Sequence, residues 1–269
     1  MITKEYEKSD GIFIFTDNAR DEDYCEDGLD NLYKHENKHF WFKTRKDVIL
    51  DAFQSFSKKN DNILEVGAGT GNVSRHLTKN GFVNISIGEM HSNGLRYAKS
   101  YGIEKLYQFD LMDPPFKGEF DAIGMFDVLE HISEDKLALS NVNRMLCSEG
   151  LVYITVPAHD WLWSADDVFA KHKKRYTKPE LSKLLNSAGF EVINIKYFYT
   201  FITPLLFLRR ILNPAYKANS KYSTTDSLRI SPLPNFVLNQ ICKFENWISN
   251  LVTFPFGGSI LAVAKAVKQ

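Results

Sequence analysis

The sequence predicts an α/β fold built around a parallel sheet, and three observations lead to this prediction. From about residue 62 onward, short apolar runs rich in Val, Ile and Leu alternate with segments of helical spacing. A Gly-rich turn joins the first of these runs to the helix that follows it. Strands separated by helices of this length indicate βαβ units, whose strands run parallel in one sheet.

The first sixty residues precede this alternating region. Residues 1–30 are acidic and irregular, and we expect the most acidic stretch, residues 17–30, to form a solvated flap. Residues 32–56 have helical spacing and predict one or two helices. These helices carry an unusual aromatic patch, His39-Phe40-Trp41-Phe42.

Gly and Pro mark the boundaries of the elements that follow. A helix is expected to end near Gly81, and another at Gly189, because glycine commonly ends helices. The pair Pro114-Pro115 interrupts the chain after the third strand, and Pro157 stops the fifth. The predicted strands are residues 63–66, 83–89, 105–109, 120–126, 150–156, 190–198 and 258–266. The predicted helices between them are residues 72–80, 92–101, 135–146 and 180–188.

About sixty residues separate the last two strands and form an insertion. Residues 201–212 and 235–252 are apolar and predict helices, joined by a polar linker that contains prolines. The insertion has three alternative interpretations, namely a lid over a pocket, an interfacial helix that touches a membrane, or a dimer surface. We favour the lid, because the segment returns the chain to a core strand.

Composition excludes several classes of protein. The chain of 269 residues suits one large domain, or one domain with an insertion. Lys plus Arg and Asp plus Glu both number 33, and a chain with zero net charge is a poor candidate for general nucleic-acid binding. Cys25, Cys147 and Cys242 form no CxxC pair, which argues against a disulfide framework or a zinc site. The N-terminus lacks a signal pattern and no apolar run is long enough to span a membrane, so we expect a cytoplasmic protein.

The Gly-rich turn at residues 67–71 is accompanied by acidic residues at three successive strand ends. Glu65 lies two residues before Gly67, where it suits an ammonium ligand and would repel the diphosphate of a dinucleotide. Glu89 ends the second strand, where an acid can accept hydrogen bonds from ribose hydroxyls. Asp110 follows the third strand, where it can accept a hydrogen bond from an adenine amino group. The same residue types occur as solvated strand-end carboxylates, but three in succession favour a nucleoside ligand with a positive charge.

Residues 63–71, Ile-Leu-Glu-Val-Gly-Ala-Gly-Thr-Gly, resemble motif I of the class I S-adenosylmethionine (SAM)-dependent methyltransferases. Residues 126–132, Phe-Asp-Val-Leu-Glu-His-Ile, resemble the segment that lies beside the methionine part of SAM in that family. The resemblance covers about residues 40–200 and the last strand. It implies a Rossmann-like, doubly wound sheet of seven strands whose last strand is antiparallel, and SAM as the cofactor.

The resemblance and the spacing together give a domain plan and a cofactor site. We expect an N-terminal flap with helices at 1–60, the SAM-binding domain at 61–200, the lid insertion at 201–257 and the last strand at 258–269. Arg45 is placed to reach the carboxylate of SAM from the N-terminal helix. The predicted cofactor-binding residues are Arg45, Glu65, Gly67, Ala68, Gly69, Gly71, Glu89, Met90, Asp110, Leu111, Phe126 and Asp127.

A narrower resemblance involves residues 39–45, residues 156–159 with 161–164, and residues 172–176. These segments are similar to a bacterial subgroup whose members are linked to surface-polysaccharide or natural-product pathways. The similarity implies a pathway class and does not fix a substrate.

Two histidines at strand ends are candidates for a catalytic base. His131 follows the fourth strand and His159 follows the fifth, at the edge where α/β sites form. The alternative for His131 is a helix-start histidine that bonds to neighbouring backbone. Glu130 and His131 together have a second alternative, a divalent-ion site, but two ligands are a weak signal and we expect no metal.

The acceptor is expected to be anionic. Residues 171–175 are the densest basic run, and a carboxylate acceptor would need such groups but no base. We therefore predict Trp41, Lys174, Arg175 and Tyr176 as substrate-binding residues. The alternatives are core packing for Trp41 and a solvated face for the basic run.

The sequence thus predicts a SAM-dependent methyltransferase, most simply an O-methyltransferase that acts on an anionic small molecule, a peptide carboxylate or a glycan intermediate. Methylation of nitrogen or carbon is the alternative reaction, and a SAM-binding regulatory module is the alternative without catalysis. An NAD-dependent dehydrogenase is disfavoured by Glu65. No nucleic-acid partner is expected, peripheral membrane contact stays open, and the oligomeric state is not predicted.

Overall fold

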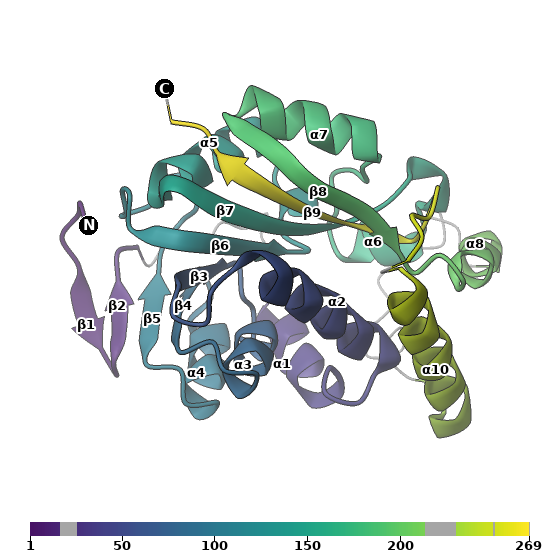
Figure 1. Cartoon of the computed structure of the whole chain (residues 1–269). Helices are drawn as coiled ribbons and strands as arrows, with labels where there is room; N and C mark the ends of the chain where they lie inside the picture. The colour runs from purple at the N-terminus through teal and green to yellow at the C-terminus, as the bar shows by residue number, and fades with distance from the viewer. Residues whose placement is uncertain (17–25, 213–229, 250, 269) are drawn as a thin grey trace.

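The computed structural model describes residues 1–16, 26–212, 230–249 and 251–268. In this part of the chain, nine strands form one sheet in the order β1-β2-β5-β4-β3-β6-β7-β9-β8 (Figure 1). The strands are β1 Glu7–Ser9, β2 Ile12–Ile14, β3 Asn62–Val66, β4 Asn84–Glu89, β5 Lys105–Gln108, β6 Phe120–Phe126, β7 Leu146–Pro157, β8 Phe190–Phe198 and β9 Ser259–Ala266.

The sheet is doubly wound, as the sequence predicts. From β3 the chain adds β4 and β5 on one side, then crosses to add β6 and β7 on the other, and all these strands are parallel. The strand order therefore reverses between β3 and β6, which is where ligands bind in open α/β sheets. β9 is antiparallel to both β7 and β8, so the seven predicted strands and the direction of the last one are confirmed.

Helices cover both faces of the sheet. Figure 1 shows α5 and α7 on one face, and α2, α3 and α4 on the other. α10 packs beside α2, while α8 lies at the end of the sheet where β8 and β9 meet the insertion. The helices are α1 Glu26–His35, α2 Phe40–Phe56, α3 Asn72–Lys79, α4 Ser92–Ser100, α5 Asp135–Met145, α6 Ala165–Phe169, α7 Lys178–Ser187, α8 Thr203–Leu212 and α10 Pro232–Ile248, with short 3₁₀ turns η1 Leu129–His131 and η2 Asp160–Leu162.

Local sequence explains where the helices near the site begin. α7 starts with a capping box, in which Thr177 and Glu180 satisfy each other's backbone N–H groups, and Pro179 occupies the first turn. α6 starts with a second capping box, formed by Ser164 and Asp167. The sequence does not predict α6, because a helix of five residues has no measurable apolar period.

The first sixteen residues are more regular than the irregular segment that the sequence predicts. β1 and β2 form an antiparallel hairpin, and β2 pairs in parallel with β5, which extends the sheet beyond the expected edge. Ile12 is buried in a small cluster with Ile87 and Leu106, so burial of apolar surface holds this short hairpin in place. The acidic residues 17–25 and most of the linker 213–234 lie outside the described residues. Within the described residues, no helix is both long enough and apolar enough to cross a membrane.

Candidate active site

A cavity of about 1090 Å³ opens at the carboxyl ends of the parallel strands. Its walls come from the loops after β3, β4, β5 and β6, from α1 and α2, and from α8 of the insertion. Fourteen of the predicted site residues line it, namely Trp41, Arg45, Glu65, Gly67, Ala68, Gly69, Glu89, Met90, Asp110, Leu111, Phe126, Asp127, His131 and Arg175. The strand-end residues that lie far apart in the sequence therefore share one cavity.

The glycine turn forms the part of the cavity wall that follows β3. Gly67 donates its N–H to the carbonyl of Gly88 at 2.8 Å, and its φ of +62° is one that residues with side chains rarely adopt. A Cβ on Gly67 would lie 2.7 Å from Cγ2 of Val128. The turn thus places bare backbone against the cavity, and a side chain at this position would displace the loop after β6.

Gly71 has a different role from the one predicted. It does not line the cavity, and a Cβ on it would lie 2.7 Å from Cδ1 of Ile87 and 2.8 Å from Cβ of Ala98. Gly71 therefore allows α3 to pack closely against β4 and α4, which is a structural requirement of the turn.

The three strand-end acids are held by backbone N–H groups. Glu89 accepts hydrogen bonds from the N–H groups of Gly69, Met90 and His91 at 2.7, 2.7 and 3.0 Å. Asp110 accepts one from Met112 at 2.8 Å. Three bonds leave the Glu89 carboxylate with capacity for about one more, since a carboxylate has about four acceptor sites.

Glu65 is used in part to cap a helix. One of its oxygens accepts hydrogen bonds from the backbone N–H of Ser74, at 2.8 Å, and from the Ser74 hydroxyl. Burial raises the pKa of Glu65 to about 7, against the effect of these hydrogen bonds. The carboxylate therefore stabilises the first turn of α3 as well as facing the cavity.

Arg45 of α2 and Asp127, which follows β6, form an ion pair at the cavity wall. Asp127 has a φ of +56°, and its other oxygen accepts a hydrogen bond from the Thr155 hydroxyl at 2.8 Å. Burial opposes the charge of Arg45, but Asp127 raises its pKa. The buried Nε of Arg45 has no hydrogen-bond partner among the described residues, so one donor of this guanidinium is unused.

Two contacts that the sequence does not reveal hold the N-terminal helices over the glycine turn. The Thr70 hydroxyl donates to the buried Glu36, which directly follows α1, at 2.7 Å, and Lys46 of α2 donates to Asn72 at 2.9 Å. Trp41 stacks on Tyr199 with ring centroids 3.9 Å apart. This end of the cavity is therefore closed by α1 and α2 together.

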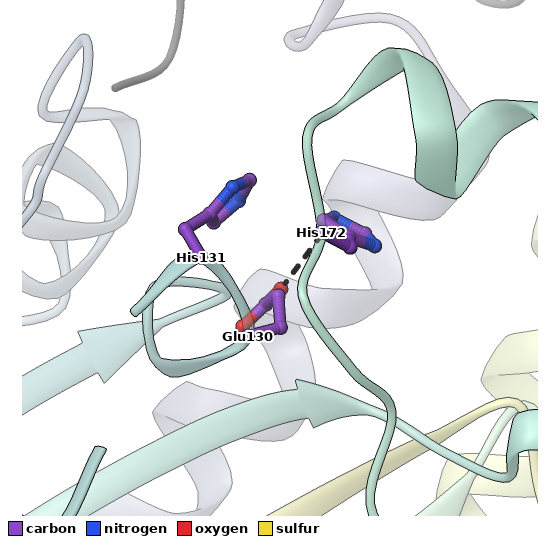
Figure 2. A group of neighbouring side chains, drawn as sticks. All are labelled: Glu130, His131 and His172. Atoms are coloured by element: carbon purple, nitrogen blue, oxygen red, sulfur yellow. Dashed lines mark ion pairs between the residues drawn. The ribbon is translucent and has the colours of Figure 1, made fainter. Parts of the chain in front are cut away.

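At the other end of the cavity, Glu130 and His131 on the turn after β6 lie opposite His172 (Figure 2). The ring centroids of His131 and His172 are 4.8 Å apart, and Nε2 of His172 lies 3.9 Å from Oε1 of Glu130. Burial, and then the neighbouring His172, lowers the pKa of His131 to about 4, so its ring is neutral near pH 7. Burial, and then Asp127, raises the pKa of Glu130 well above its usual value.

His172 is oriented by a carboxylate. Its Nδ1 lies 2.8 Å from Oδ1 of Asp167, and Arg175 donates to both oxygens of the same aspartate at 2.8 and 2.9 Å. Burial opposes ionisation of Asp167, but the hydrogen bond with His172 and the ion pair with Arg175 lower its pKa to about 2. An ionised aspartate only accepts hydrogen bonds, so Nδ1 carries the proton and Nε2 faces Glu130.

The basic run is the main correction to the predicted site. Lys174 does not line the cavity and pairs with Asp135, and the buried Tyr176 donates its hydroxyl to Leu129 and Asp135 behind the wall. Arg175 lines the cavity, but Asp167 and the carbonyl of Ala158 occupy its guanidinium. The sequence analysis treats residues 171–175 as one group of positive charges, whereas the fold places a carboxylate beside Lys174 and another beside Arg175.

His159 is also misplaced by the sequence prediction. It lies outside the cavity lining and stacks on Trp161 and Tyr197, with ring centroids 5.3 and 5.0 Å away. His172 and Asp167 are two of the cavity residues that sequence reasoning missed. The only available signal was a histidine inside a basic run, and that signal is equally typical of a solvated loop.

A doubly wound sheet with a glycine turn, strand-end acids and an antiparallel last strand defines a Rossmann-like methyltransferase fold. The family model for the methyltransferase domain matches residues 33–195, and the chain belongs to this family. S-adenosylmethionine is its cofactor.

Solved structures share the fold at low sequence identity. A Haloferax volcanii protein in complex with the Trm112 methyltransferase activator has a TM-score of 0.62 and 14% identity, covering 93% of this chain and all of that one (100%). A SAM-dependent methyltransferase from Thermotoga maritima has a TM-score of 0.56 and 15% identity, covering 89% and 95% of the two chains. Phosphoethanolamine N-methyltransferase 2 of Haemonchus contortus, solved with S-adenosylhomocysteine, has a TM-score of 0.54 and 16% identity over 83% of this chain and 52% of that chain.

Proposed function

We propose that this methyltransferase methylates an oxygen atom of a neutral, hydroxylated acceptor. The observation that supports the proposal is His172, whose ring is oriented by Asp167 and lines the cavity. A hydroxyl group must lose its proton as the new bond to carbon forms, and a histidine held by a carboxylate is suited to handle that proton. His131 is a weaker proton acceptor near neutral pH, because its pKa is about 4.

A neutral acceptor accounts for the cavity better than the anionic acceptor that the sequence suggests. Arg175 is bound by Asp167, Arg209 of α8 by Asp166, and Arg45 by Asp127. Only Arg45 among these three has a buried donor without a partner, and it lies at the cofactor end. An anionic acceptor would therefore have to compete with a carboxylate for each of the other two guanidinium groups.

In this proposal, the predicted cofactor residues bind SAM and orient it in the cavity. SAM supplies a methyl group on a positively charged sulfur when it is bound. The glycine turn leaves room for it, Glu89 accepts from the ribose and Asp110 from the adenine. Arg45, which lines the cavity, donates from its guanidinium to the carboxylate of the amino-acid part. Transfer forms the oxygen–carbon bond and breaks the sulfur–carbon bond, while the hydroxyl proton leaves toward His172.

The described parts of the insertion, α8 and α10, form the acceptor side of the proposed pocket. Ile202, Leu205 and Leu206 of the α8 region line the cavity, together with Leu238 of α10. These side chains give the acceptor end an apolar wall, which suits the carbon skeleton of a natural product. We therefore keep the lid interpretation and propose that α8 contacts the acceptor and not the cofactor.

The experiment uses SAM carrying a deuterated methyl group and a panel of hydroxylated metabolites, with the methylated position read by mass spectrometry. The expected product is a methyl ether. His172→Ala should lower kcat by about 100-fold or more, the usual contribution of a proton-handling group, while cofactor affinity is unchanged. His159→Ala is the matched control, because His159 lies outside the cavity lining. Label on nitrogen or carbon, or unchanged kcat in His172→Ala, would refute the proposal.

A further inference from the structure

The charges around Glu130 are unbalanced among the described residues. Three carboxylates lie close together here, and Asp127 is paired with Arg45 while Asp167 is paired with Arg175. Glu130 is 1% exposed, and neither of its oxygens has a hydrogen-bond partner. A buried carboxylate without a partner is costly, so this position calls for a proton or a cation.

The two neighbouring histidines supply nitrogen donors on the same side. One ligand atom from each of Glu130, His131 and His172 can be chosen so that all three lie within 4.8 Å of one another, the only such group among the described residues. His172 presents Nε2 because its Nδ1 proton is bound by Asp167. A histidine that donates its other N–H to a carboxylate is the usual arrangement around protein-bound metals.

The backbone fixes the two segments that carry these ligands. Lys173 donates its N–H to the carbonyl of Glu130 at 2.7 Å, so the chain on either side of the cluster is joined directly. Metal–ligand distances of about 2.0–2.2 Å place tetrahedral ligand atoms roughly 3.3–3.6 Å apart. The separation of 3.9 Å between Nε2 of His172 and Oε1 of Glu130 is close to this spacing, and small side-chain rotations would complete the set.

We propose that Glu130, His131 and His172 bind one divalent transition-metal ion, with zinc as the representative, and that its open coordination positions face the cavity. Two imidazoles and one carboxylate suit zinc, iron or cobalt, whereas magnesium and calcium prefer oxygen ligands. The pairs Asp127–Arg45 and Asp167–Arg175 are neutral, so the ion would leave a local charge of about +1 with Glu130 ionised. This site departs from the sequence expectation that the chain binds no metal.

The role of the ion rests on the proposed function. An ion at this position can bind the acceptor hydroxyl and lower its pKa, so that the proton passes to water before the oxygen attacks the methyl carbon. His172 then acts as a ligand, and the ion takes over its part in handling the hydroxyl proton. The residual positive charge is balanced by the resulting alkoxide.

The test measures metal binding directly, without SAM or acceptor. The full chain is dialysed against a chelator and titrated with Zn²⁺ by calorimetry and with Co²⁺ by visible spectroscopy. The expected result is one high-affinity equivalent in the native protein and in His159→Ala. Affinity should fall by about tenfold or more in Glu130→Gln and His172→Ala. Glu130→Gln keeps the shape of the side chain and breaks no hydrogen bond of the Glu130 oxygens, so its fold is expected to persist, and circular dichroism checks this.

Absence of binding at millimolar Zn²⁺, or equal binding in all four proteins, overturns the metal site. Assaying the chelated and reloaded proteins separates this proposal from the proposed function. Methyl-ether formation that persists without any metal binding refutes the ion and leaves O-methylation in place. Site-dependent metal binding with a product methylated on nitrogen or carbon supports the ion and refutes O-methylation.

Discussion

Replacing Asp167 by Asn removes the carboxylate that orients His172 and pairs with Arg175. Burial opposes ionisation of Asp167, yet His172 and Arg175 lower its pKa from 3.8 to about 2. At about 1.4 kcal/mol for each pKa unit, the ionised side chain contributes about 2–3 kcal/mol to stability at pH 7. The Asp167 side chain is fully buried, so solvent screening does not reduce this value much.

The sign of the pH dependence follows from the lowered pKa. The contribution is present above the unfolded pKa of 3.8 and is lost as the pH falls through the folded pKa of about 2. The stability difference between the native protein and Asp167→Asn should therefore stay near its neutral value at pH 5 and be roughly halved near pH 3. Urea unfolding at a series of pH values measures it.

Asp166→Asn is the matched control, since Asp166 pairs with Arg209 at a site where both side chains are partly exposed, 34% and 42%. Exposed pairs contribute about 0–1 kcal/mol, so this neighbour should have little effect. Equal stability of Asp167→Asn and the native protein at pH 7 would refute the reasoning. A difference that is unchanged at pH 3 would refute the assignment to ionised Asp167.

Two further predictions concern the two ends of the cavity. Gly67→Ala should weaken SAM binding by at least about tenfold in calorimetry, because its Cβ would lie 2.7 Å from Val128. Gly102→Ala is the control, because Gly102 has a φ of +86° and an added Cβ there would have no atom within 4 Å. This variant carries the same kind of backbone strain and should bind SAM with native affinity. Equal SAM affinities of the two variants would count against a close approach of the Gly67 backbone to the cofactor. Leu205→Gln should raise the KM for an apolar acceptor and leave SAM affinity alone, because Leu205 lines the cavity. Leu208→Gln changes an exposed side chain outside the cavity lining and should keep the native KM. An equal increase of KM in both leucine variants would contradict the assignment of Leu205 to the acceptor pocket.

The sequence predicts the central sheet well because each of its strands is defined by local signals. Apolar runs bounded by Gly and Pro mark β3 to β9, and the glycine turn marks the connection from β3 to α3. The hairpin of β1 and β2 was missed because each strand has three residues and gains its stability from β5, which lies about ninety residues further along the chain. No local pattern carries that information.

The part of the cavity beside the glycine turn is predictable for the same reason, whereas the part around Glu130 and His172 is not. Glu65, Glu89 and Asp110 sit at strand ends, so the sheet brings them together once the strands are placed. Whether Arg175 is free to bind a ligand depends on its ion pair with Asp167. The chemical role of His172 depends on Glu130, which lies opposite its Nε2. A count of charges along the sequence treats every charged side chain as free to bind a ligand. In the folded chain, Arg175 is paired with a carboxylate, whereas Glu130 is buried without a hydrogen-bond partner.

The position of β9 has a consequence for how the molecule is assembled. β8 pairs with β9 and β9 pairs with β7, so residues 259–266 fill a gap between two strands made earlier. During synthesis the half of the sheet that carries the glycine turn has all its neighbours long before β9 emerges from the ribosome. Until β9 is present, the edge of β7 that pairs with it and the whole of β8 have backbone N–H and C=O groups without a strand partner. Unpaired strand edges of this kind can pair with other chains. Pairing of β9 with β7 and β8 thus completes this half of the sheet late, and it covers strand edges that would otherwise favour aggregation of the nascent chain.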